Sequence, residues 1–480
     1  MSGGVVSDQT DGAPESALER SIGLFGATAI GVGTMIAGGI FVLSGLAVAN
    51  VGAAAAVSFV LAAVVASVTA LTYAEFATIY TVDGGGYAYV AEVFDSDWSY
   101  LVGWLLVLGY PASAAFYLAS FADWFARFLL PAFSVSSALP FWAPATVVLA
   151  MLVAINLAGA EETGWFQIVV TGLKIALIGF FLFGGLRAFR ADVVAQSLAT
   201  NVTHVSDVAL TAALVFITFF GFEAIATSEG EIESPERTVP RAIFLSIGLV
   251  TVLYVLVVVV VVLAINDAGF LSFLAERAGL STPDAATGLL AEHGEVAMAR
   301  AAQYYLGDVG FYVFVVGALL SMISAANATV LAGSRVKLAM AERGQLPDAV
   351  GRISSRTGTP TVAVAVTGGL ILAFFLTFSV LFGTAPGESA RGVVLGLESL
   401  AHFADFMLLA GLVFVNVALI QSRRSKPDQV RLFRVPGVPW VPLVGVASNL
   451  ALLASLELRS IALGVLALVV GVVFWFAVVE

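Results

Sequence analysis

Residues 31–41 read Gly-Val-Gly-Thr-Met-Ile-Ala-Gly-Gly-Ile-Phe, a glycine-rich stretch inside an apolar segment at 22–48. A segment of this length can cross a bilayer as a helix, which takes about 20 mostly apolar residues. Backbone that unwinds at membrane depth must find hydrogen-bond partners, so an interruption survives where it lines a cavity or contacts a ligand. The stretch therefore predicts a membrane helix broken near its centre, at a site where a small solute is carried.

The rest of the chain has the composition of an all-α membrane protein. Of its 480 residues, 60% are hydrophobic and 11% are charged, and the mean hydropathy is +1.01. A soluble domain carries about a quarter charged residues. Apolar runs between turn and charge clusters predict about 12 transmembrane helices, at 22–48, 51–80, 98–130, 141–159, 163–186, 207–229, 240–265, 309–341, 360–383, 393–421, 438–457 and 460–479.

The distribution of Lys and Arg predicts which helix ends face the cytoplasm, where these residues are in excess. With the N-terminus inside, the cytoplasmic side holds 13 of them, Arg335 and Lys337 included, against 7 outside. Both termini are then cytoplasmic, in a multi-pass protein of the cell membrane. We expect a cytoplasmic tail at 1–20, a transporter core at 21–421, and a cytoplasmic loop with two further helices at 422–480.

Residue usage excludes several classes of function. Without cysteine the chain forms neither disulfides nor thiolate metal sites, and its three histidines are too scattered for a metal cluster. No basic stripe indicates nucleic-acid binding, and no nucleophile–base pair or phosphate loop indicates an enzyme. We expect no cofactor. The net charge of −12, with three lysines among 21 basic residues, is typical of loops that face concentrated salt and favours a haloarchaeal source.

A second interruption, Phe-Phe-Gly-Phe-Glu at 219–223, falls in the sixth predicted helix. Glycine clusters also occur at simple helix–helix contacts, and each cluster alone fits that explanation. Their placement in the first and sixth helices, five spans apart, favours a substrate site at corresponding positions of two inverted repeats. We expect these repeats at about 21–190 and 205–421. A half-helix N-terminus at such a break attracts an anion such as a carboxylate.

At these residues the chain resembles the amino acid–polyamine–organocation (APC) superfamily, and its branch of cationic amino acid transporters most. The matching motifs, in order, are 33–41, 73–76 (Tyr-Ala-Glu-Phe), 84–90 (Gly-Gly-Gly-Tyr-Ala-Tyr-Val), 220–243 and 333–347. They cover spans one to ten. The resemblance implies a LeuT-like fold, with a 5+5 inverted repeat, unwound first and sixth helices, and two extra C-terminal helices.

The resemblance also implies how an amino acid substrate is held. Backbone N–H groups of the first helix would bind its carboxylate, carbonyls of the sixth helix would accept from its amine, and apolar side chains would surround its side chain. The carboxylate site departs from the family motif at Ala37, where a glycine is usual. The methyl group of this alanine narrows the loop. The assigned residues are Ala37, Gly38 and Gly39 for the carboxylate, Ile217 and Phe220 for the amine, and Ile36, Phe216 and Phe222 for the pocket.

Lys174 lies inside the fifth predicted helix, 12 residues after Glu162 and 13 before Arg187. At about 1.5 Å per residue this places it near the midplane, where a lysine costs about 2.5–3.5 kcal/mol. A lysine satisfied by carbonyls for structural reasons is the simpler alternative. The resemblance implies that Lys174 replaces a sodium ion as a proton-coupling group. Its partners would be the carbonyls of Gly33 and Ile36 and the hydroxyl of Ser324 or Ser321.

Other acidic residues have less specific expectations. Glu223 follows the second interruption and is either part of the binding site and proton-sensitive, or a structural partner of unwound backbone. Glu75 is expected to bind loop backbone, and Asp123 to pair with Arg127 one turn away. The four glutamates between 229 and 236 are expected to form a solvated cytoplasmic face.

Together these features predict a secondary active transporter that takes up small or hydrophobic L-amino acids with protons and without sodium, by alternating access. An amino acid exchanger and a cationic amino acid permease are open alternatives, since the same site supports both. A non-transporting amino acid sensor is a third. Counterflow without any ion gradient favours an exchanger, and binding without flux indicates a sensor.

Overall fold

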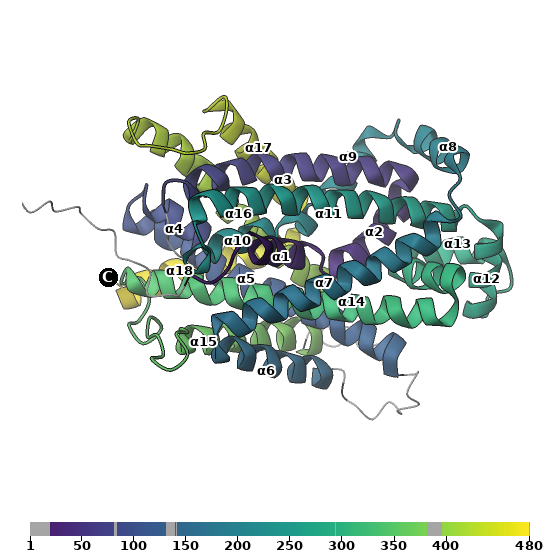
Figure 1. Cartoon of the computed structure of the whole chain (residues 1–480), viewed down its shortest axis with the longest axis horizontal. Coiled ribbons are helices and arrows are strands. Elements are labelled where there is room, and N and C mark those ends of the chain that lie inside the picture. Colours follow the sequence, from purple (N-terminus) through teal and green to yellow (C-terminus); the bar gives the residue numbers. More distant parts are fainter. Residues whose placement is uncertain are drawn as a thin grey trace, which may run out of the picture.

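The computed structural model describes residues 20–80, 84–130, 140, 142–292, 294–381 and 396–479. The predicted tail at 1–20 lies outside these residues, apart from Arg20. Regular structure in the described part is helical, with a single parallel bridge between Ile22 and Ile232. The long helices run roughly along the long axis of the bundle (Figure 1), as expected for segments that cross a bilayer side by side.

The helices of the first half include one broken pair, α1 and α2, and three long helices, α3, α5 and α7. A short 3-10 turn precedes α3, and a short π turn follows α5. The bounds are α1 Leu24–Met35, α2 Gly38–Val51, α3 Ala55–Ala77, α4 Gly85–Ala91, α5 Ser96–Trp124, α6 Trp142–Ala158, α7 Ala160–Leu186 and α8 Ala191–Asn201.

The second half again begins with a broken pair, α9 and α10, and continues with the long helices α11, α14 and α16. Within α14 the backbone turns at Gly307, where φ is 69°. The bounds are α9 Val205–Val215, α10 Phe222–Thr227, α11 Pro235–Ile265, α12 Ala268–Ala278, α13 Pro283–Glu292, α14 Gly294–Glu342, α15 Thr361–Phe375, α16 Leu397–Ser425, α17 Trp440–Ala454 and α18 Leu458–Phe474.

The number of spanning helices is lower than predicted when each is judged by length and apolarity. In the described part of the chain eight helices qualify, or nine if the bent pair Val205–Ala212 and Phe216–Thr227 is one span. The predicted intervals 22–48, 141–159 and 438–457 contain α1, α6 and α17, of 12, 17 and 15 residues. At about 1.5 Å per residue these are shorter than a 30 Å hydrocarbon core. The predicted number of about 12 spans is higher because it includes these three intervals, whose helices are too short to qualify.

The outer faces of several helices are apolar, which identifies an integral membrane protein. On α18, Leu466, Val469 and Val473 are each more than half exposed, and Val64 on α3 and Val252 on α11 are similar. Soluble proteins rarely expose continuous apolar patches of this kind. Apolar helix faces of this kind are typical of an integral membrane protein, because a hydrocarbon surrounding removes the cost of exposing them to water.

Three short helices, α8, α12 and α13, gather at one end of the bundle, and α4 lies toward the other (Figure 1). The charge distribution predicts the first of these ends to be extracellular. Asp267 caps α12 by accepting from the N–H groups of Gly269 (2.7 Å) and Phe270 (3.2 Å), which satisfies amides that a helix start leaves free. Helices α12 and α13 lie in the connection between the seventh and eighth predicted spans.

Candidate substrate and coupling site

The first break lies at Ile36 and Ala37, between α1 and α2. Their φ/ψ angles are −77°/73° and −109°/−151°, so neither residue is helical. Helix α2 begins at Gly38, and no side chain caps its N-terminus. Because a helix start leaves backbone N–H groups without helical partners, this end of α2 offers donors toward the break. Ala37 is buried, and its methyl group stands at the turn itself.

The second break lies between α9 and α10, where Phe216–Phe219 form a 3-10 turn and the two halves are bent by 43°. The carbonyl of Ile217 accepts from the Phe220 N–H (3.1 Å), and the carbonyl of Phe220 accepts from the Glu223 N–H (3.2 Å). Both predicted amine-binding carbonyls therefore take part in local turns. Each carbonyl oxygen has a second lone pair, so each still has capacity for another donor.

The two breaks pack closely against each other. A methyl group added to Gly221 would lie 2.6 Å from the Met35 nitrogen and 2.8 Å from Thr34 Cβ, and one added to Gly39 would meet Thr218. Ile36, Phe216 and Phe222, the predicted pocket residues, are all buried here. The absence of a side chain at Gly221 thus allows the backbones of the two broken helices to approach.

Replacing Gly221 with alanine should lower amino acid transport by at least about tenfold, because an added methyl that meets backbone forces the broken helices apart. Transport by the purified protein in liposomes measures this. The matched control is Gly248→Ala in α11, where an added methyl has no atom within 4 Å. Wild-type transport by Gly221→Ala would show that the close approach has no functional role.

Lys174 is fully buried, and its ammonium joins three helices. Nζ donates to the carbonyl oxygen of Gly33 at 2.6 Å, to that of Ile36 at 3.0 Å, and to Ser324 Oγ at 3.2 Å. The structure thus brings together Lys174 and the partners that the resemblance implies, with Ser324 as the hydroxyl. Ser321 is also buried, but its hydroxyl has no hydrogen-bond partner among the described residues.

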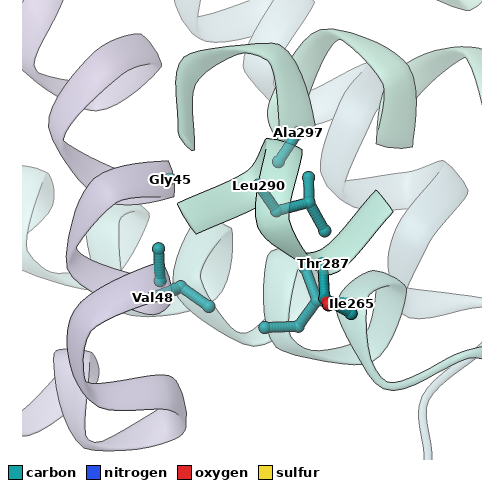
Figure 2. A pocket seen from close by; sticks show the side chains of 7 residues that line it. Gly45, Val48, Ile265, Thr287, Leu290 and Ala297 are labelled. Atoms are coloured by element: carbon teal, nitrogen blue, oxygen red, sulfur yellow. The ribbon is translucent and has the colours of Figure 1, made fainter. Parts of the chain in front are cut away.

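Further along α2, toward the predicted extracellular end, a cavity of about 190 Å³ opens beside the start of α14. Figure 2 shows that the side chains lining it are aliphatic apart from that of Thr287, which carries a hydroxyl. The cavity lies between α2, the end of α11, α13 and α14, and not at the breaks themselves. Its lining residues are Gly45, Val48, Ala49, Ile265, Thr287, Leu290 and Ala297.

Glu223 is buried and binds a side chain rather than unwound backbone. Its Oε1 accepts from the Tyr73 hydroxyl at 2.5 Å, and a methyl group added to Gly86 would lie 2.9 Å from the same oxygen. The carboxylate therefore connects α10 to α3 beside α4. Neither expectation for Glu223 named this side-chain contact with Tyr73, and a role of Glu223 in the binding site stays a prediction.

The expectation of a solvated glutamate face after the sixth helix is wrong for two of its four residues. Glu229 and Glu231 are both fully buried. Glu229 accepts from the Tyr89 hydroxyl at 2.6 Å, and Glu231 forms an ion pair with Arg335, itself buried. Their partners come from α4 and α14, far away in sequence, so local charge density gave no sign of burial.

Other contacts at the predicted cytoplasmic end match their expectations more closely. Glu75 Oε2 accepts from the backbone N–H of Val435 at 2.7 Å, as expected of a residue that binds loop backbone, and it also pairs with Arg423 and Arg431. In the outer half, Asp123 and Arg127 form the expected pair at 3.3 Å.

Several polar residues around the site were not predicted. The Tyr254 hydroxyl donates to the carbonyl of Met35 at 2.9 Å. Lys337, counted among the charges of the cytoplasmic side, is buried and donates to the carbonyls of Val107 and Gly333. Gln167 packs against the backbone of Gly33. Its spacing of seven residues before Lys174, two helical turns, is a sequence signal that identifies it.

Two interrupted membrane helices that face each other, with a buried lysine bound to one of them, define a polytopic helical transport protein. Residues 22–478 match the family described as Amino acid permease. The chain belongs to this family of the APC superfamily, and it is a transport protein rather than an enzyme.

Relatives with named activities cover nearly the same length. The branched-chain amino acid permease BcaP of Bacillus subtilis is 27% identical over 96% of this chain and 93% of its own. The serine/threonine exchanger SteT of the same organism is 26% identical, over 92% of each chain. Cationic amino acid transporter 4 of Arabidopsis thaliana, a vacuolar protein, is 29% identical over 75% of this chain and 59% of its own. The family and these relatives agree on amino acid transport.

Proposed function

We propose that the protein is a secondary active transporter that takes up small or hydrophobic L-amino acids together with protons, without sodium. The observation that carries this proposal is the position of the Lys174 ammonium. It binds two carbonyls at the break of α1 and a hydroxyl of α14, and both kinds of oxygen are typical ligands of a metal cation in proteins. A protonated amine there supplies the positive charge that a bound cation would supply.

In our proposal the Lys174 ammonium links a mobile helix, α1, to the fixed helices α7 and α14. A protonated lysine offers three N–H donors and a charge, and hydrogen bonds to charged groups contribute about 1.5–3 kcal/mol each. Loss of the proton removes the charge and weakens the hold of α7 and α14 on the broken helix α1. In our proposal protonation holds α1 against the bundle, and deprotonation releases it, so that the site opens alternately to the two sides.

The substrate class follows from the residues at the breaks. The uncapped N-terminus of α2 suits a carboxylate, since helix starts carry partial positive charge, and Ala37, Gly38 and Gly39 would provide the N–H groups. Ile36, Phe216 and Phe222 are apolar and buried, which favours an apolar side chain. The name of the relative BcaP, a branched-chain amino acid permease, supports this choice.

The proposal includes a membrane arrangement. Twelve spans, with repeats at about 21–190 and 205–421 and two further helices at 422–480, would place both termini on the cytoplasmic side of the cell membrane. The three apolar helices that are too short on their own, α1, α6 and α17, complete this number if α1 and α2 form one broken span.

Uptake by purified protein in liposomes tests the proposal. We expect leucine or alanine to accumulate when a pH gradient, acidic outside, is imposed, and to accumulate equally with sodium or with potassium as the only other cation. Uptake that requires a sodium gradient and ignores the pH gradient would contradict it. Counterflow that persists at full rate without any gradient, together with no pH-driven accumulation, would instead favour an exchanger, the activity named for the relative SteT.

A further inference from the structure

A column of buried polar side chains continues from Lys174 toward the predicted cytoplasmic end. Gln167 and Thr171 lie seven and three residues before Lys174 on α7, so all three share one helix face. A methyl group added to Gly33 would meet Gln167 Nε2 and would lie 2.7 Å from Thr171 Oγ1. Both side chains therefore pack on the same backbone whose carbonyl binds Lys174.

The column has a second wall on α14 and α6. Asn327 follows Ser324, the hydroxyl partner of Lys174, by three residues on α14. Asn327 Oδ1 accepts from Asn156 Nδ2 at 2.9 Å, and Asn156 lies two residues before α6 ends at Ala158. Polar groups thus extend from the Lys174 ammonium to Asn156, which lies about 3 Å along the helix axis from the C-terminal end of α6.

Four polar atoms in this column lack partners among the described residues: both amide atoms of Gln167, Asn327 Nδ2 and Asn156 Oδ1. The three side chains are 2%, 0% and 3% exposed. Buried polar groups in proteins are almost always hydrogen-bonded, and a buried water typically makes about three such bonds. Of these four atoms the two amide nitrogens donate and the two amide oxygens accept, so together they offer the hydrogen-bond partners that ordered water requires.

Along α7 the column extends in one direction only. On the other side of Lys174 the same face of α7 continues with Ile178 and Phe181, four and seven residues later, both buried and apolar. The Phe181 ring lies against that of Phe314, with centroids 5.0 Å apart. Polar residues at −3 and −7 and apolar residues at +4 and +7 place the polar surroundings of Lys174 along α7 on its predicted cytoplasmic side.

We propose that ordered water bound between α6, α7 and α14 forms the path by which Lys174 releases its proton to the cytoplasm. This rests on the proposed function. An N–H bond of the ammonium breaks, its electron pair stays on Nζ, and the nearest water takes the proton. Each water then passes on one of its protons, until bulk water receives one. Gln167 and Asn327 hold the water and are positioning residues; no described ion pair includes Lys174, so its proton has no carboxylate to go to.

Cysteine labelling tests whether water reaches the column. The chain has no cysteine of its own, so Gln167→Cys carries a single thiol. A thiol reacts as its thiolate, which forms in water and not in an apolar surrounding. We expect a membrane-impermeant methanethiosulfonate reagent, added on the cytoplasmic side of oriented vesicles, to label Gln167→Cys at least about tenfold faster than Ile178→Cys. Both positions are 2% exposed and lie on one helix face, and equal labelling rates would overturn the water site.

Proton-driven uptake tests what the water does. Gln167→Leu should slow leucine uptake driven by a pH gradient about tenfold, while leucine binding, measured by thermal shift, stays at the wild-type level. Asn449→Leu, which removes a fully buried amide in α17, is the matched control, and Thr171→Val replaces Gln167→Leu if that variant does not fold. Wild-type uptake by the Gln167 variant overturns the proton path. A wild-type protein that ignores a pH gradient overturns the proposed function, and the labelling ratio still decides whether the water site exists.

Discussion

Replacing Lys174 with methionine should abolish pH-driven accumulation of amino acid while leaving substrate binding within about threefold of the wild type. Nζ makes three hydrogen bonds, two of them to the carbonyls at the break of α1. Two bonds from a charged donor contribute about 3 kcal/mol or more, which corresponds to a change of about 100-fold in the equilibrium between held and released α1. Uptake into liposomes with and without a pH gradient, and binding by thermal shift, measure the two effects.

The control for this variant is Lys337→Met. Lys337 is as deeply buried as Lys174, and its ammonium also binds two carbonyls, those of Val107 (3.4 Å) and Gly333 (3.1 Å). These carbonyls belong to α5 and α14, and neither helix is interrupted at these residues. Lys337→Met should therefore keep pH-driven uptake. If Lys174→Met also keeps it, Lys174 is a structural lysine and the protein is coupled in another way or not at all.

The breaks could be located from the sequence because they depend on local features, whereas the partners of Lys174 were implied by the family resemblance. Glycines at membrane depth mark Ile36 and Gly221, and a lysine far from any helix end must find oxygen partners. The choice between Ser321 and Ser324 could not be made from sequence. They lie three residues apart on one face of α14, and the level at which α14 packs along α7 decides which hydroxyl reaches the ammonium.

The charged residues near the predicted cytoplasmic end were harder to predict for a related reason. Arg335 and Lys337 were counted among the charges of the cytoplasmic side, and Glu229 and Glu231 as part of a solvated face, but all four are buried. A charge is buried only where a partner meets it, and here the partners come from other helices. The distance along the chain between Glu231 and Arg335, 104 residues, hides this pairing from any local pattern.

Arg335→Ala should lower the free energy of unfolding by about 3–5 kcal/mol, because it leaves the buried carboxylate of Glu231 without its partner. Arg335 Nε donates to Glu231 Oε1 at 2.6 Å, and the two side chains are 1% and 0% exposed. A clear fall in the thermal midpoint of the detergent-solubilised protein, followed by tryptophan fluorescence, measures the loss. Arg127→Ala is the matched control, since its pair with Asp123 is more than a third exposed and such pairs contribute at most about 1 kcal/mol.

A double variant separates the stability of this ion pair from a role in transport. Glu231 joins three elements: its side chain binds α14, and its carbonyl accepts from the N–H groups of Ser21 (3.0 Å) and Ile22 (2.9 Å), just before α1. Glu231→Met with Arg335→Met removes both charges and keeps apolar volume, so stability should return close to the wild type. If the ion pair also holds the predicted cytoplasmic end of the broken helices closed, the stable double variant should still transport more slowly than the wild type. Full transport would show that the pair serves folding alone, because the backbone bonds to the start of α1 would then suffice to close that end.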